Sequence, residues 1–84
     1  MPEILIYTKP GCPYCRAAKA LLAKKGATYT EIDVSNPADQ RAMSLKANGR
    51  STVPQIFIGT RHIGGSDDIH ALDARGGLDT LLEV

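Results

Sequence analysis

The sequence predicts an α/β fold in which a four-stranded mixed sheet carries helices on both faces, with elements in the order β-α-β-α-β-β-α. Two observations predict it. Short runs rich in β-branched and aromatic residues alternate with longer helix-forming runs, beginning with Glu3–Thr8 and Cys15–Lys25. Later in the chain, two short strand-like runs follow each other across a turn. Because 84 residues suffice for only one core, we expect residues 1–84 to form a single domain.

The first half of the chain has the pattern of a βαβ unit. Glu3–Thr8 is typical of a buried strand, and Cys15–Lys25 contains no Gly or Pro, which favours a helix that stops at Gly26. Thr28–Val34 alternates polar and apolar residues, as a strand does. A helical crossover of this kind makes the two flanking strands parallel.

A second helix is predicted after this strand. Asn36 suits the N-cap and Pro37 the first helical position, and Asn48-Gly49 ends the helix. We expect one modest apolar stripe on it to face the sheet, formed by Ala38, Ala42 and Leu45.

The remaining pattern is a hairpin followed by a last helix. Thr52–Ile58 is predicted to be a strand with Pro54 near its start, and Gly59–Arg61 to be the turn into a return strand at His62-Ile63. Ser66-Asp67-Asp68 is predicted to cap a helix that runs through Arg75. One further helical turn or two is expected at Leu78–Leu82.

Both cysteines lie where the first strand gives way to the first helix, in the motif Cys12-Pro13-Tyr14-Cys15. Pro13 suits the first helical position, which makes Cys12 the N-cap and places its sulfur at the positive end of the helix dipole. This environment favours the thiolate form, so we expect Cys12 to be a nucleophile. Cys15 lies deeper in the first turn and is close enough to form a disulfide with Cys12. The pattern therefore predicts a redox pair with Cys12 attacking and Cys15 resolving.

Two other interpretations of the cysteine pair are disfavoured. A structural zinc ion needs four ligands, and His62 and His70 do not have the usual close spacing, so we expect no metal. A purely structural disulfide is also unfavoured, because closing so short a loop removes little entropy from the unfolded chain.

Charge and hydropathy exclude other classes of partner. The formal net charge of +1 creates no basic surface field, so nucleic acid is not an expected partner. The residues after Met1 lack the basic start and apolar run of a signal peptide, and no apolar run is long enough to span a membrane. We expect a cytoplasmic protein that does not bind membranes and is a monomer.

The element order β-α-β-α-β-β-α, with Cys12-Pro13-Tyr14-Cys15 opening the first helix and Val53-Pro54 opening the third strand, resembles the thioredoxin fold. Three blocks of sequence, in order along the chain, carry a narrower resemblance. They are Cys12-Pro13-Tyr14-Cys15, Thr52-Val53-Pro54 and Gly64-Gly65-Ser66-Asp67-Asp68. More narrowly, their spacing over essentially the whole chain is similar to that of a dithiol glutaredoxin of the bacterial glutaredoxin 3-like class. Many relatives have a further cysteine at the position of Ser66, so that third thiol is absent here.

The resemblance implies a groove for glutathione. Pro54 would be cis and face the redox pair, and the main chain of Val53 would pair with the cysteine of glutathione. The Asp67 carboxylate suits the γ-glutamyl ammonium, and the glycine carboxylate of glutathione needs a cation, for which Lys9 is the first candidate and Arg50 a weaker one. The groove residues implied by the resemblance are Lys9, Tyr14, Thr52, Val53, Pro54, Gly65, Ser66 and Asp67.

The function implied is that of an enzyme, a glutathione-dependent thiol-disulfide oxidoreductase with glutathione as co-substrate. Its expected partners are glutathione and proteins that are glutathionylated or contain disulfides. One alternative is a thioredoxin-like protein disulfide reductase, which would lack the glutathione groove. The other is an iron-sulfur cluster carrier, in which two chains hold the cluster through Cys12 and two glutathiones, and which Pro13 disfavours by stiffening the loop.

Overall fold

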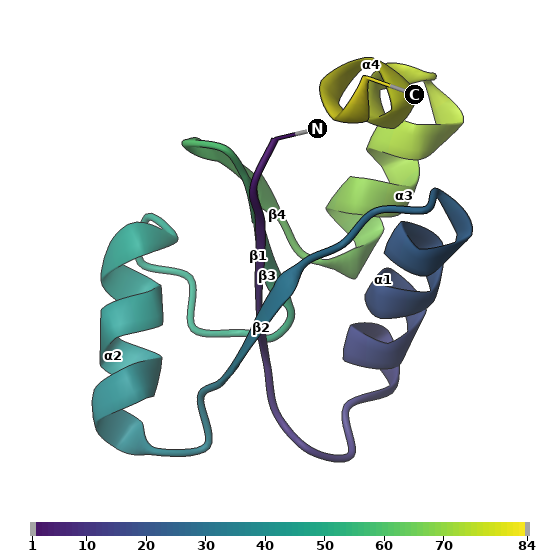
Figure 1. Ribbon diagram of the computed structural model, residues 1–84. Coiled ribbons are helices and arrows are strands. Elements are labelled where there is room, and N and C mark those ends of the chain that lie inside the picture. Colours follow the sequence, from purple (N-terminus) through teal and green to yellow (C-terminus); the bar gives the residue numbers. More distant parts are fainter. Residues whose placement is uncertain (1, 84) are drawn as a thin grey trace.

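The computed structural model describes residues 2–83 and has the predicted architecture, a mixed sheet covered by helices on both faces (Figure 1). Within this range the strands are β1 Ile4–Thr8, β2 Thr30–Asp33, β3 Gln55–Ile58 and β4 Arg61–Gly64. The helices are α1 Pro13–Lys24, α2 Pro37–Lys46, α3 Ser66–Ala74 and α4 Gly77–Leu82. None of the helices described is long and apolar enough to cross a bilayer.

The strand order β2-β1-β3-β4 brings two distant segments of the chain together. β1 is parallel to β2, as the βαβ pattern predicts, and antiparallel to β3, with Tyr7 opposite Gln55. Because β1 and β3 are neighbours that run in opposite directions, the C-terminal end of β1 lies beside the N-terminal end of β3. The loop that precedes Cys12 therefore lies beside the loop that contains Pro54.

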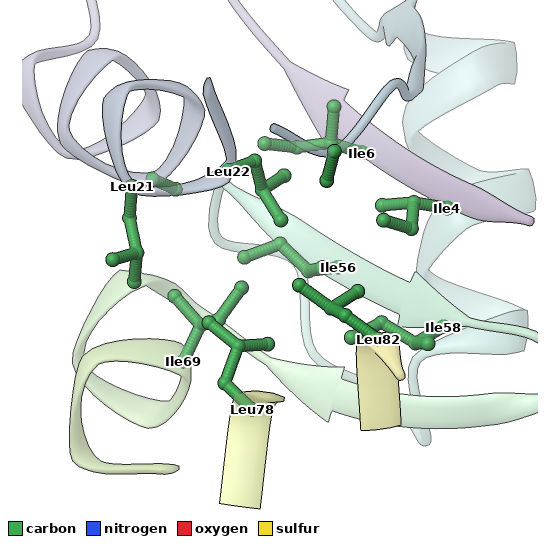
Figure 2. Close-up of a cluster of buried hydrophobic side chains, with 11 residues drawn as sticks. Ile4, Ile6, Leu21, Leu22, Ile56, Ile58, Ile69, Leu78 and Leu82 are labelled. Atoms are coloured by element: carbon green, nitrogen blue, oxygen red, sulfur yellow. The ribbon is translucent and has the colours of Figure 1, made fainter. Parts of the chain in front are cut away.

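One face of the sheet forms the larger core. In Figure 2, the isoleucines of β1 and β3 meet Leu21 and Leu22 of α1, Ile69 of α3, and Leu78 and Leu82 of α4. All of these side chains are buried. The short helix α4 thus completes the core on the side of α1 and α3 (Figure 1).

Of the helices described, only α2 covers the opposite face (Figure 1). The apolar stripe predicted for this helix is wrong. Ala38, Ala42 and Leu45 are exposed, and Leu45 is 86% accessible to solvent. The helix instead buries Met43, and the C-cap residue Ala47 one turn later, against Tyr7, Val34 and Phe57. A helix of this length has apolar residues on more than one side, and packing on the aromatic side chains of the sheet decides which side faces inward.

Several element boundaries also differ from the prediction; β2, for instance, spans Thr30–Asp33 and not Thr28–Val34. Two of the differences have a clear local cause. β3 starts at Gln55, because Pro54 has no N–H to donate to the sheet, and the Val53-Pro54 peptide is cis. Helix α3 has Gly65 rather than Ser66 as its N-cap, so that Ser66 is the first helical residue. The Ser66 hydroxyl lies 3.3 Å from Nδ1 of His70, while Oδ2 of Asp68 accepts the free N–H of Gly65 at 2.8 Å.

Candidate active site

The redox pair begins α1 as the sequence predicts. Cys12 is the N-cap and Pro13 the first helical residue. The Cys12 sulfur accepts a hydrogen bond from the backbone N–H of Cys15 at 3.1 Å. An N–H group directed at a sulfur at the start of a helix stabilises negative charge on that sulfur. Cys12 is partly accessible to solvent, so a substrate disulfide can reach it.

The second thiol has a different environment. Cys15 is buried, with 2% of its surface accessible, and both cysteines are free thiols. Burial raises the pKa of Cys15 to about 11, and its hydrogen bond with Cys12 adds to the effect, against smaller opposing contributions from the Lys9 amide and the charge of Lys19. Cys15 therefore keeps its proton while Cys12 is free to react.

A hollow of about 260 Å³ opens beside the redox pair. The Cys12 thiol lies 3.8 Å from the carbonyl oxygen of Val53, which lines this hollow. The hollow includes seven of the eight residues predicted for the groove, together with Arg50 and Asp68. These seven are Tyr14, Thr52, Val53, Pro54, Gly65, Ser66 and Asp67.

Lys9, the eighth, does not line this hollow. Its Nζ donates a hydrogen bond to Oε1 of Gln40 at 2.9 Å, and Nε2 of Gln40 donates to the carbonyl of Ser51 at 3.2 Å. Lys9 lines a second hollow of about 470 Å³, which both cysteines also line. Cys12 thus borders a second hollow, which carries the cationic side chain of Lys9. No sequence pattern predicts Gln40 as a partner of Lys9, because the two residues lie 31 positions apart in the chain.

The cation that reaches the first hollow is Arg50, and Asp68 holds it there. Oδ2 of Asp68 accepts from Nη1 of Arg50 at 3.0 Å and from the Gly65 N–H at 2.8 Å. The Gly65 N–H, and then the Arg50 guanidinium, lower the pKa of Asp68 below its usual value. Asp68 stays ionised and positions Arg50 beside the start of α3, a role that sequence reasoning did not assign to it.

Within residues 2–83, no cluster of three or more His, Cys, Asp or Glu side chains has an arrangement that could hold a metal ion. The two histidines have other partners, since His62 lies 2.7 Å from Oε1 of Gln55 and His70 lies 2.8 Å from the carbonyl of Ser66. The expectation of no metal stays a prediction.

Comparisons with known proteins agree on one family. The family model for glutaredoxin matches residues 4–63. Glutaredoxin 3 of Escherichia coli (strain K12) is 55% identical over 83 residues, which cover 99% of this chain and 100% of that protein. A buckwheat glutaredoxin solved as a complex with glutathione is 32% identical, with a TM-score of 0.87 over 98% of this chain and 77% of that chain. A glutaredoxin studied for metal binding is 57% identical, with a TM-score of 0.74 over 98% of this chain and 89% of that chain.

Proposed function

This chain belongs to the glutaredoxin family, the glutathione-dependent thiol-disulfide oxidoreductases, and we propose that Cys12 is its nucleophile and Cys15 its resolving thiol. The observation that carries the proposal is the asymmetry of the pair. The Cys12 sulfur is accessible and accepts an N–H at the start of α1, whereas Cys15 is buried with a raised pKa. A thioredoxin-like reductase is not supported, since the family is that of glutaredoxins.

Reduction of a glutathione mixed disulfide needs Cys12 alone. The Cys12 thiolate attacks the glutathionyl sulfur, the substrate leaves as a thiolate, and Cys12 keeps the glutathionyl group as a new disulfide. A second glutathione thiolate then attacks that glutathionyl sulfur. Glutathione disulfide leaves, and the Cys12 thiolate is regenerated.

Reduction of a protein disulfide uses both thiols. Cys12 attacks one sulfur of the substrate disulfide and forms a mixed disulfide with the protein. Cys15 loses its proton and attacks the Cys12 sulfur, which releases the reduced protein and leaves a Cys12–Cys15 disulfide. Two glutathione molecules then reduce this disulfide and leave as glutathione disulfide.

The hollow beside Val53 is our proposed glutathione groove. The N-terminus of α3 offers N–H groups at Ser66 and Asp67 to the γ-glutamyl carboxylate, and the Asp67 carboxylate suits the adjacent ammonium group. Arg50, expected from the sequence as the weaker candidate for the glycine carboxylate, lines this hollow and is held by Asp68, so we propose instead that its guanidinium meets the γ-glutamyl carboxylate. Lys9, on the other side of Cys12, is the proposed partner of the glycine carboxylate.

Single cysteine variants test the assignment of roles. Reduction of a small glutathione mixed disulfide is followed with glutathione, glutathione reductase and NADPH, and insulin reduction is followed with the same reductant. We expect Cys15→Ser to keep the first activity and lose most of the second, and Cys12→Ser to lose both. Activity retained by Cys12→Ser would show that the roles are wrongly assigned.

A second candidate function is that of an iron-sulfur carrier, in which two chains would hold a cluster through Cys12 and two glutathiones. We consider it because a similar glutaredoxin has been studied for metal binding. Pro13 disfavours it, because a proline at the first helical position stiffens the loop at Cys12. Anaerobic reconstitution with iron, sulfide and glutathione separates the candidates. A colourless monomer supports the oxidoreductase alone, whereas a coloured dimer supports the carrier as well.

We further propose that the protein works as a monomer in the cytoplasm, a compartment in which glutathione keeps thiols reduced. Its proposed substrates are glutathionylated proteins and proteins with reducible disulfides. Nucleic acid and membranes are not proposed as partners.

A further inference from the structure

A chain of hydrogen bonds connects the proposed glutathione groove with the interior of the protein. Gln55, the first residue of β3, is completely buried. Its Nε2 donates to the carbonyl oxygen of Thr52 at 3.0 Å and to the Thr52 hydroxyl at 3.2 Å. Thr52 is exposed and lines the groove. A buried side chain thus holds the main chain of a groove residue.

The chemistry of the partners fixes how the Gln55 amide is oriented. The Thr52 carbonyl can only accept a hydrogen bond, so the NH₂ group of Gln55 faces it. The Gln55 oxygen then faces Nε2 of His62 at 2.7 Å, and this nitrogen must carry the hydrogen. In the neutral ring, Nδ1 of His62 is then an acceptor, and Nδ2 of Asn48 lies 3.4 Å from it. The hydrogen bonds run in one direction from Asn48 through His62 and Gln55 to Thr52.

The His62 ring is itself held in place. It stacks on the ring of Phe57, with centroids 4.8 Å apart and planes 26° from parallel. Burial lowers the pKa of His62, and the Arg50 charge adds to this effect against the weaker opposing charge of Asp68. Lys46 adds a further cation beside the stack, 4.9 Å from the Phe57 centroid. These surroundings favour the neutral ring that the hydrogen-bond chain requires.

Gln55 is the polar residue in a strand whose other residues are apolar. The next three residues of β3, Ile56–Ile58, are apolar and buried, and an amide without partners would be costly to bury among them. Here both polar atoms of the Gln55 side chain have partners. Nε2 of Gln55 reaches Thr52, the first residue of the segment Thr52–Pro54. This segment precedes the first residue pairs of the β3 ladder, so the sheet does not order it.

We propose that Gln55 is a positioning residue, whose carboxamide, oriented by His62, holds Thr52 and Val53 in the conformation that receives glutathione. The proposal rests on the proposed function in so far as it concerns glutathione. It does not make Gln55 a catalytic residue, because the side chain lies beneath the groove and acts through Thr52.

Gln55→Met tests the proposal, since Met has a similar volume and no hydrogen-bonding amide. The KM for a small glutathione mixed disulfide should rise about fivefold, the effect of roughly one hydrogen bond, with little change in kcat. Alkylation of Cys12 by iodoacetamide, which does not use the groove, should keep its rate. The control is Ile56→Val, which weakens the core from the neighbouring position of β3 without touching the hydrogen-bond chain, and should leave KM unchanged.

A second measurement does not depend on glutathione. NMR of the free protein should show His62 protonated at Nε2 and not at Nδ1. The ¹H–¹⁵N heteronuclear NOE of the Thr52 and Val53 amides should fall in Gln55→Met and stay at the wild-type value in Ile56→Val. His62→Phe, which keeps the ring on Phe57 but removes the donor, should raise KM about twofold.

Two results would overturn the proposal. One is a wild-type His62 protonated at Nδ1, and the other is a Gln55→Met protein with the same KM and the same amide NOE values as Ile56→Val. If the wild-type protein reduces no glutathione mixed disulfide, the proposed function fails and the glutathione part of this inference fails with it. The NOE comparison would still decide whether Gln55 orders Thr52 and Val53.

Discussion

Substitution of Gly64 by alanine should destabilise the protein more than substitution of any exposed turn glycine. Gly64 ends β4 with φ +117°, a conformation that side chains rarely adopt. A Cβ atom there would overlap the Asp68 carboxylate and come within 2.9 Å of Nη1 of Arg50. Asp68 would have to leave its 2.8 Å hydrogen bond with the Gly65 N–H, where α3 begins.

The magnitude follows from these contacts. An alanine in a sparsely populated backbone region costs about 1–3 kcal/mol. Loss of the charged hydrogen bond at Gly65 costs about 1.5–3 kcal/mol more. The ion pair of Asp68 with Arg50 is about half exposed, and such pairs contribute at most about 1 kcal/mol. Gly64→Ala should therefore lower the free energy of unfolding by about 2.5–7 kcal/mol, a large part of the roughly 5–15 kcal/mol typical of a small domain.

Gly59→Ala is the matched control. Gly59 also has a positive φ, +61°, but an added Cβ there would meet no atom within 4 Å, so only about 1–2 kcal/mol of backbone strain is expected. Both variants are unfolded in urea and followed by circular dichroism. Equal losses of stability would show that the Asp68 contacts do not make Gly64 special. A Gly64→Ala protein that fails to fold beside a folded Gly59→Ala protein would support their importance.

Three further predictions concern single side chains. The first compares alkylation by iodoacetamide at pH 7.5 of Cys12 in a Cys15→Ser protein and of Cys15 in a Cys12→Ser protein. Cys12 should react more than about tenfold faster, because burial raises the pKa of Cys15. Equal rates would contradict the proposed roles. His62 has a lowered pKa in the folded state, so the unfolded chain binds more protons as the pH falls below the ordinary value of 6.5. The contribution of His62 to the free energy of unfolding should be complete above pH 6.5 and be lost as the pH falls through the lowered pKa. Urea unfolding between pH 7.5 and 5 should therefore show a steeper loss of stability in the wild type than in His62→Phe. Met43→Ala should lower the free energy of unfolding in urea by about 2–5 kcal/mol, and Leu45→Gln by less than about 0.5 kcal/mol. A larger loss for Leu45→Gln than for Met43→Ala would mean that α2 turns its other side to the sheet.

The sequence best predicts those parts of the fold that depend on residues close together in the chain. The start of α1 follows from Cys12 and Pro13 alone, because capping is a local property. The buried face of α2 does not follow in this way, since Leu45 and Met43 are equally apolar in the sequence. Met43 is the buried one because it packs on Tyr7 of β1, Phe57 of β3 and Val34 after β2, which lie far from it in the sequence.

In the candidate site, too, the sequence predicts local features but not contacts between residues that lie far apart in the chain. The motifs predict which segments meet, and seven of the eight expected groove residues line one hollow. They do not predict which cation enters it, because Arg50 is held there by Asp68, 18 residues away, and Lys9 is turned toward Gln40. The buried Gln55 is also absent from the prediction, since a single polar residue at the start of an apolar strand gives no sign of its partner.

The assignment of Cys12 as the nucleophile is best tested by finding which sulfur carries glutathione. The Cys15→Ser protein is mixed with glutathione disulfide and examined by mass spectrometry with peptide mapping, beside the Cys12→Ser protein under the same conditions. We predict rapid formation of one glutathione adduct on Cys12 and almost none on Cys15, because Cys12 is accessible and Cys15 is buried. An equal or faster adduct on Cys15, or none on Cys12, would contradict the proposed mechanism.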